Sequence, residues 1–140
     1  MSVPLLAGLK AAIGFIEDIG LESIRRRSIA LARYATSRLR DVASVRMVSA
    51  EQPAGGGSGM VSFALPSIAP ERLTAHLWES GRIVGRTVPD AACMRLGFHA
   101  FNTAAEVDGA VEAMAEAVKH GIPDRDYPSI PTEWNAIVEL

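Results

Sequence analysis

The first part of the chain spaces its apolar residues with the period of an α-helix. From residue 4 to about residue 40, apolar positions recur three or four residues apart. The first stripe consists of Leu5, Leu6, Leu9, Ile13 and Ile16, and the second consists of Leu21, Ile24, Ser28, Leu31, Ala35 and Leu39. Gly20 separates the two stripes, and glycine weakens a helix interior. The sequence therefore predicts either one bent helix or two consecutive helices that meet at Gly20.

The rest of the chain mixes short strand-like segments with helical ones. The predicted elements are, in order, strand 44–50, loop 51–59, strand 60–65, helix 70–81, strand 82–88, turn 89–91, strand 93–99 and helix 103–119. Pro70 suits the first turn of the middle helix. Thr103 and Glu106 have the spacing of a capping box, in which the side chain of each residue caps the backbone of the other.

This order of elements predicts an α+β fold with a small, mainly antiparallel sheet of about four strands. Single helices connect the hairpins, so the helices should cover one face of the sheet and leave the other open. An open sheet face suggests a missing partner, either another domain or another subunit. We expect one domain over residues 1–121 and a proline-containing tail over residues 122–140, anchored by Tyr127 and Trp134.

The candidate site lies on the predicted strand 93–99. Two sets of three residues alternate along this segment, so a strand would place them on opposite faces. One set is Met94, Leu96 and Phe98, and the other is Arg95, Gly97 and His99. The guanidinium of Arg95, fixed on a strand beside a glycine, suits a two-pronged grip on a carboxylate. The alternative is an ordinary strand arginine paired with an Asp or Glu, and spacing alone favours this alternative.

Composition excludes several classes of function. The chain has 140 residues, a net charge of -2 and 49% hydrophobic residues, which fits one globular domain and gives no reason to expect nucleic acid as a partner. Arginines opposite the second apolar stripe, at Arg25, Arg26, Arg33 and Arg40, have no interleaved aromatic residues. We therefore interpret them as a solvated helix face.

Other motifs also favour plain structural interpretations. The glycine-rich residues 51–59 lack the Lys-Ser/Thr pair of a phosphate-binding loop and precede a strand, which indicates a hairpin loop. Cys93 is the only cysteine, and no basic residue adjoins it to lower its pKa, so we expect it to pack rather than react. With neither a signal peptide nor a membrane-spanning run, and a single thiol, the sequence predicts a cytoplasmic protein. We expect no metal site.

Three segments resemble the C-terminal small domain of class V aminotransferases. These fold-type I pyridoxal-phosphate enzymes include cysteine desulfurases, selenocysteine lyases and isopenicillin N epimerase-like proteins. The segments read LKAAIGFIEDIGLESIRRR, GMVSFALP and GRIVGRTVPDAACMRLGFHAFNTAAEVDGAVEAM, and the resemblance covers about residues 3–119. Its most specific part is the Arg-x6-Asn-Thr spacing from Arg95 to Thr103, followed by Glu-Val-Asp at the start of a helix.

The resemblance implies roles for individual residues. The arginine of this motif binds the substrate α-carboxylate in the family, and that role falls on Arg95. Arg86 matches an arginine of the preceding strand that also borders the active site. Strand alternation places His99 on the same face as Arg95, which makes it a weaker candidate for the entrance, and an ordinary surface histidine is the alternative. The implied substrate is an amino acid or a keto acid. The implied cofactor of the intact enzyme is pyridoxal phosphate.

Departures from the family pattern limit what this chain can do alone. Its two lysines, Lys10 and Lys119, both fall on predicted helix surfaces, and the family's large domain is absent. We therefore expect no bound cofactor, no catalytic residue and no activity without a large pyridoxal-phosphate-binding domain or subunit.

Residues 87–90, Thr-Val-Pro-Asp, replace the cysteine loop of desulfurases. Gly97 and Phe101 replace the usual Ser and Tyr of the motif, which favours the epimerase-like branch. One alternative is a non-enzymatic module that dimerises or binds a protein through the open sheet face. A ligand-sensing domain is another alternative, and it requires a pocket.

Overall fold

The computed structural model describes residues 2–50 and 56–124, and it confirms the predicted α+β class. The helices are α1 (Val3–Ile19), α2 (Leu21–Arg40), α3 (Pro70–Gly81) and α4 (Ala104–His120). The strands are β1 (Arg46–Met47), β2 (Met60–Ala64), β3 (Arg86–Val88) and β4 (Cys93–Gly97), with a short 3-10 turn, η1 (Pro89–Ala91), before β4. The tail residues 125–140, including Tyr127 and Trp134, lie outside the described part.

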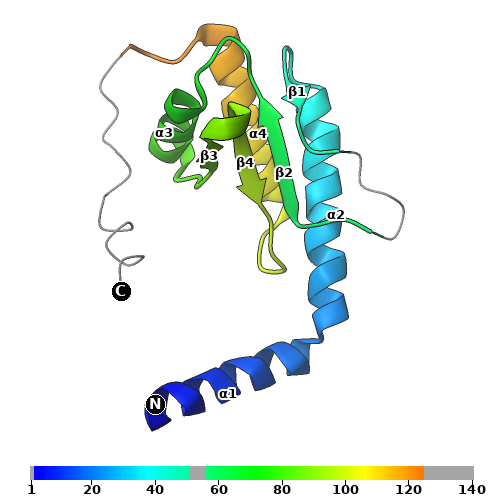
Figure 1. The fold of residues 1–140 in the computed structure, drawn as a ribbon. Coiled ribbons are helices and arrows are strands. Elements are labelled where there is room, and N and C mark those ends of the chain that lie inside the picture. The colour runs from blue at the N-terminus through cyan, green and yellow to red at the C-terminus, as the bar shows by residue number, and fades with distance from the viewer. Residues whose placement is uncertain (1, 51–55, 125–140) are drawn as a thin grey trace.

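The four described strands form one antiparallel sheet in the order β1-β2-β4-β3. Helices α2, α3 and α4 pack on one face of this sheet, as Figure 1 shows. The largest fully buried side chains between the two layers are Leu39, Phe63, Leu73, Leu77, Met94 and Met114. Within the described residues no helix covers the opposite face, which agrees with the sequence-based expectation of a two-layer domain.

All four described strands are shorter than predicted, β2 by a single residue because it ends at Ala64 instead of Leu65. The predicted strand 44–50 reduces to β1, because the carbonyl oxygen of Ser62 accepts hydrogen bonds from both Val48 and Ser49 and so ends regular pairing there. The predicted strand 82–88 reduces to β3, because residues 82–83 complete the C-terminal cap of α3. Arg82 adopts a left-handed conformation with φ of 52°. The predicted strand 93–99 ends at Gly97.

Helix α1 projects away from the rest of the domain (Figure 1). None of its residues is buried, and its large apolar side chains are between 39% and 76% exposed. Of the two alternatives for Gly20, the structure shows two consecutive helices, and the φ of 89° at Gly20 lies in the left-handed region that favours glycine. This glycine therefore separates an isolated apolar helix from the packed domain. No helix of residues 2–50 and 56–124 combines the length and the apolar character that crossing a membrane requires.

A polar contact joins α2 to α4 beside the core. The carboxylate of Asp108 accepts a hydrogen bond of 2.7 Å from the Tyr34 hydroxyl and one of 2.9 Å from Nε of Arg38. The hydrogen bond from Tyr34, followed by the hydrogen bond and charge of Arg38, lowers the pKa of Asp108 below its ordinary value. This pairing fixes the first half of α4 against α2, and so fixes where the loop before α4 leaves the sheet.

Candidate functional site

Arg95 lies in the middle of β4 on the face of the sheet that no described helix covers. Its cross-strand partners are Ser62 of β2 and Arg86 of β3. Nε of Arg95 donates a hydrogen bond of 3.1 Å to the hydroxyl of Ser62, which is only 7% exposed. That contact uses the inner nitrogen of the guanidinium. The two outer nitrogens, which make the two-pronged contact with a carboxylate, therefore remain available at the half-buried end of the side chain.

Ser62 is itself held in place by the segment that follows β1. Its backbone N–H donates a hydrogen bond of 2.7 Å to the hydroxyl of Ser49. Its carbonyl oxygen accepts two hydrogen bonds of 2.9 Å, from the N–H groups of Val48 and Ser49. A continuous set of hydrogen bonds thus runs from Ser49 through Ser62 to Arg95. These hydrogen bonds fix the position of Ser62, and Ser62 in turn fixes the orientation of the Arg95 guanidinium.

Three arginines share the uncovered side of the sheet, and we call this surface the arginine face. Arg86 stands directly opposite Arg95, and Arg46 stands opposite Ala64 at the other edge of the sheet. Neither Arg86 nor Arg95 has a carboxylate partner among residues 2–50 and 56–124. Like charges directly opposite each other on a sheet are unfavourable. The arrangement suits an anion that enters between these two side chains.

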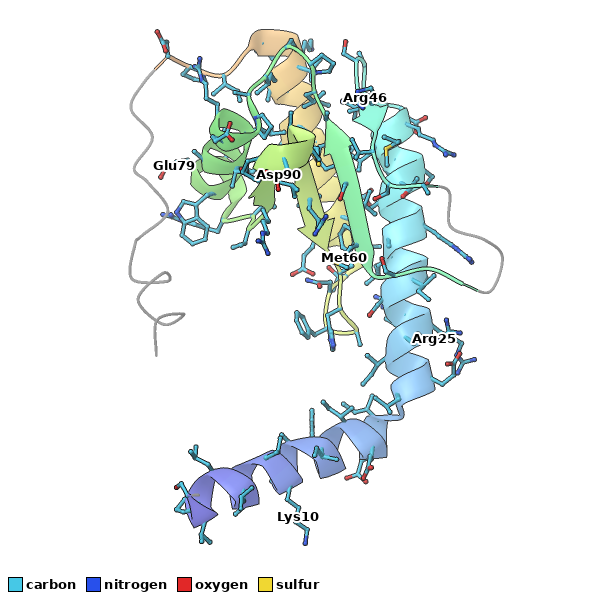
Figure 2. The ribbon with its side chains drawn as sticks, in the orientation of Figure 1. Lys10, Arg25, Arg46, Met60, Glu79 and Asp90 are labelled. Atoms are coloured by element: carbon cyan, nitrogen blue, oxygen red, sulfur yellow. The ribbon has the colours of Figure 1, made fainter. Side chains whose placement is uncertain are left out.

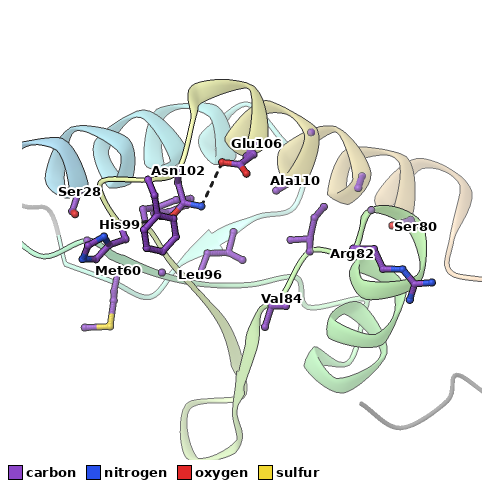
Figure 3. A pocket seen from close by; sticks show the side chains of 18 residues that line it. Ser28, Met60, Ser80, Arg82, Val84, Leu96, His99, Asn102, Glu106 and Ala110 are labelled. Atoms are coloured by element: carbon purple, nitrogen blue, oxygen red, sulfur yellow. Dashed lines mark hydrogen bonds between the residues drawn. The ribbon is translucent and has the colours of Figure 1, made fainter. Parts of the chain in front are cut away.

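His99 lies apart from the arginine face. Because β4 ends at Gly97, strand alternation does not reach His99, which sits in the following turn with its ring stacked on Phe101 at 4.8 Å. It lines a groove of about 1040 Å³ at the end of the sheet, between α4 and the end of α3 (Figure 3). Arg86 and Arg95 do not line this groove. The structure therefore places two of the three predicted site residues together and the third elsewhere.

The Asn-Thr part of the motif builds the turn between β4 and α4. The side-chain oxygen of Asn102 accepts a hydrogen bond of 2.9 Å from the N–H of His99. Thr103 and Glu106 form the predicted capping box, in which Glu106 accepts a hydrogen bond of 2.7 Å from the Thr103 N–H. This backbone hydrogen bond, with contributions from the Asn102 and Thr103 side chains, lowers the pKa of Glu106. These residues therefore act structurally, by fixing the exit of the strand that carries Arg95.

Comparison with known proteins identifies the family. The sequence profile described as Aminotransferase class-V matches residues 1–109. The chain belongs to this family. Among curated relatives, a cysteine desulfurase of Haloferax volcanii is 31% identical over 120 residues, which are 79% of this chain and 28% of the relative. A probable cysteine desulfurase of Streptomyces coelicolor is 31% identical over 117 residues, 76% of this chain and 28% of the relative.

Solved structures share the fold. The cysteine desulfurase CsdA of Escherichia coli superimposes with a TM-score of 0.70 at 22% identity, over 81% of this chain and 30% of that protein. The cystine C-S lyase C-DES, solved with its reaction product cysteine persulfide, superimposes with a TM-score of 0.53 at 23% identity, over 68% of this chain and 23% of that protein. The chain thus spans less than a third of the length of the relatives it matches.

Within residues 2–50 and 56–124, neither lysine lies in the groove or on the arginine face, where it could hold a cofactor. Both lysines are exposed on helices, Lys10 on α1 (Figure 2) and Lys119 in the last turn of α4, and neither lines the groove or the arginine face.

Cys93 is 1% exposed, so its thiol lacks the access that a nucleophile needs. No group of three or more metal-ligating side chains occurs within the described residues.

Strand alternation predicted Arg95 on the open face, and the family resemblance added Arg86 to the site, but neither pointed to Ser62 or Ser49. One signal was available for Ser62, because it is a polar residue in the middle of a central, otherwise apolar strand. Buried polar groups in such strands normally have a partner. The role of Ser49 was not visible, because it depends on the local irregularity that ends β1.

Proposed function

We propose that residues 1–121 form the small domain of a pyridoxal-phosphate-dependent class V aminotransferase-like enzyme, and that Arg95 holds the carboxylate of its amino-acid or keto-acid substrate. One observation carries this proposal. The guanidinium of Arg95 is oriented by Ser62 and has no acidic partner within the described residues, so it differs from an ordinary strand arginine in an ion pair. A preoriented guanidinium binds a carboxylate with a smaller loss of side-chain entropy.

Arg86 adds a second positive charge beside the first. Its position directly opposite Arg95 favours an anion in the space between the two side chains. His99 has no direct part in the carboxylate site, because it lines the separate groove at the end of the sheet. In this proposal His99 contributes to the entrance or to contacts with another domain.

The chain requires a second polypeptide segment for catalysis. Pyridoxal phosphate acts as an electron sink in amino-acid chemistry, and it is held by a lysine and by a partner for its ring nitrogen. The two exposed lysines described above do not meet these requirements. We therefore assign cofactor binding to a large domain or subunit of the family type. The role of this chain is to present Arg95 to a substrate held there.

A titration tests the carboxylate site on this chain alone. Nitrogen-15 NMR follows the Nε–H resonance of Arg95 while pyruvate is added, with pyruvamide as a matched ligand that lacks the negative charge. We expect saturable shifts with a Kd on the order of millimolar for pyruvate and none for pyruvamide. Arg95→Lys should bind more weakly than wild type, because an ammonium cannot form the two-pronged contact. Equal shifts with both ligands would refute the assignment.

A reconstitution tests the wider role. The chain is mixed with a polypeptide that carries the large domain of the family and with pyridoxal phosphate, and lyase and transaminase activities are measured. We expect activity that requires both polypeptides and that falls about a hundredfold or more in Arg95→Ala, the loss expected for removal of a charged contact. Activity that is unchanged in Arg95→Ala would exclude a role for this residue in substrate binding.

A further inference from the structure

We propose that a cleft beside α2 binds a phosphate group, and we call it the α2 cleft. Figure 1 shows β1 next to the C-terminal half of α2, and a cavity of about 260 Å³ lies between that half of the helix and the residues that end and follow β1. The lining residues are Arg33, Thr36, Ser37 and Arg40 of α2 together with Met47, Ser49 and Ala50. Arg86 and Arg95 do not line this cleft, and it shares no residue with the groove that His99 lines. It is therefore separate from both surfaces described above.

Two arginines give the α2 cleft its charge. Arg33 and Arg40 are seven residues apart, about two turns or roughly 10 Å along the helix, so both side chains leave the same side of α2. The sequence indicated a solvated helix face at these positions, and the structure adds that this face borders a cavity. Nη2 of Arg33 donates a hydrogen bond of 3.2 Å to the carbonyl oxygen of Gly56, a contact that uses one of the five N–H donors of a guanidinium. Within residues 2–50 and 56–124, no Asp or Glu lines the cleft to neutralise the two positive charges.

Ser49 adds a neutral donor whose position is fixed. Its hydroxyl oxygen accepts a hydrogen bond of 2.7 Å from the N–H of Ser62, and its own N–H donates one of 2.9 Å to the Ser62 carbonyl oxygen. The hydroxyl hydrogen of Ser49, in contrast, has no acceptor in the described part of the chain. Thr36 and Ser37 donate their hydroxyl hydrogens to backbone carbonyls of α2 instead. An oxygen atom bound in the cleft would therefore complete the hydrogen bonding of Ser49.

The size and the donors of the α2 cleft favour a phosphate group. Its volume is below the range of about 300–1,000 Å³ that is typical of sites for drug-sized ligands. A phosphate group carries up to two negative charges and several acceptor oxygens, so it can accept hydrogen bonds from both guanidinium groups and from Ser49 at once. A carboxylate offers half that charge and fewer acceptor oxygens. No aromatic side chain of the described residues lines the cleft, so it lacks the stacking surface that binds nucleic-acid bases.

A titration of the whole chain with inorganic phosphate tests this site, and it is independent of the proposed carboxylate site because it follows other residues. Nitrogen-15 NMR follows the backbone N–H resonances of Ser37, Ser49 and Ala50 at constant ionic strength, with acetate as the singly charged control. We expect saturable shifts with a Kd on the order of 1 mM for phosphate and none for acetate. Glycerol 3-phosphate distinguishes the two sources of the group. A lower Kd than that of inorganic phosphate identifies a phosphate ester as the ligand, and a higher Kd identifies the free ion.

Variants of α2 separate the cleft from charge in general. Arg33→Gln combined with Arg40→Gln should raise the Kd about tenfold or more, because each arginine contributes hydrogen bonds between charged groups. Arg25→Gln combined with Arg26→Gln removes the same charge from the same helix outside the cleft, and it should leave the Kd within about twofold of wild type. Arg95→Ala should retain the shifts, because the arginine face takes no part in the α2 cleft. Circular dichroism checks that each variant keeps its helix content.

Each of the following outcomes would overturn the proposal. Absence of saturation in the wild-type chain, or equal shifts with acetate, would show that the α2 cleft is not a phosphate site. An equal loss of affinity in both double variants would show that only net charge matters. Loss of the shifts in Arg95→Ala would place the ion on the arginine face. Glu51 follows Ala50 and lies outside the described residues, and binding by Glu51→Gln but not by wild type would show that the chain's own carboxylate fills the cleft.

Discussion

Replacement of Ser62 by alanine should weaken carboxylate binding at Arg95 without unfolding the domain. The substitution removes the acceptor of the 3.1 Å hydrogen bond from Nε of Arg95 and leaves the backbone contacts of Ser62 with Ser49 in place. A hydrogen bond to a charged group contributes about 1.5–3 kcal/mol when both partners are buried. Because Arg95 is only half-buried, water replaces part of this contact, and we expect a loss of about 1 kcal/mol in the free energy of unfolding.

Ser62→Ala should also weaken pyruvate binding, because the Arg95 side chain becomes more mobile before the ligand binds. Without Ser62, the guanidinium must be immobilised by the ligand, and ordering one long side chain costs about 0.5–1.5 kcal/mol. The Kd for pyruvate should therefore rise about 2- to 10-fold in Ser62→Ala. The NMR titration described for Arg95 measures this directly. The same spectra should show a broader or shifted Nε–H resonance before any ligand is added.

Two matched variants isolate the role of the hydroxyl. Ser62→Thr keeps an acceptor in a strand position that suits a β-branched residue, and it should bind nearly as wild type. Ser49→Ala removes the acceptor of the Ser62 N–H, so it should reduce stability more than it changes the Nε–H resonance. If Ser62→Ala bound pyruvate with the wild-type Kd while Arg95→Ala did not bind, the orientation of Arg95 by Ser62 would be refuted.

Three further predictions concern the framework of the site. Phe63→Ala removes a fully buried aromatic ring from the centre of β2 and should lower the free energy of unfolding by about 3–5 kcal/mol in urea denaturation, whereas a loss below 1 kcal/mol would contradict the assigned core. Thr103→Ala removes half of the capping box and should cost about 1 kcal/mol, with Thr103→Ser as the control that keeps the hydroxyl. The lowered pKa of Asp108 means that its contribution to stability is present above its unfolded pKa of about 4 and is lost as pH falls through its folded pKa. Asp108→Asn should therefore have a lower Tm than wild type near neutral pH and a smaller further loss on acidification, and parallel Tm curves would count against this pairing.

Much of the fold was predictable because local patterns and tertiary packing agree. Gly20 marks a helix boundary in both sequence and structure, and Thr103 with Glu106 forms the expected cap. The edge strands were overestimated, because apolar character alone does not show where hydrogen-bonded pairing stops. At Arg82 and Ile83 the backbone closes the end of α3 rather than pairing in the sheet, and no side-chain pattern indicates this.

The candidate site was predictable only in part, for a related reason. Strand alternation placed Arg95 on the open face, and the cross-strand register then brought Arg86 beside it. The same alternation failed at His99, where the chain leaves the sheet at Gly97 and Asn102 closes a turn. The contact between Ser62 and Arg95 joins residues 33 positions apart, so it depends on strand register, which a single sequence specifies poorly.

Because Arg86 and Arg95 are direct cross-strand neighbours, the Tm of the domain should rise when an anionic ligand binds between them. The two positive charges repel each other and destabilise the folded domain locally, and an anion bound between them removes this repulsion. By mass action, an anion present at a hundred times its Kd stabilises the folded chain by about 2.7 kcal/mol. Each kcal/mol corresponds to about 3 °C in Tm for a domain of this size. A thermal-shift screen of carboxylates can therefore rank candidate substrates before any catalytic partner has been found.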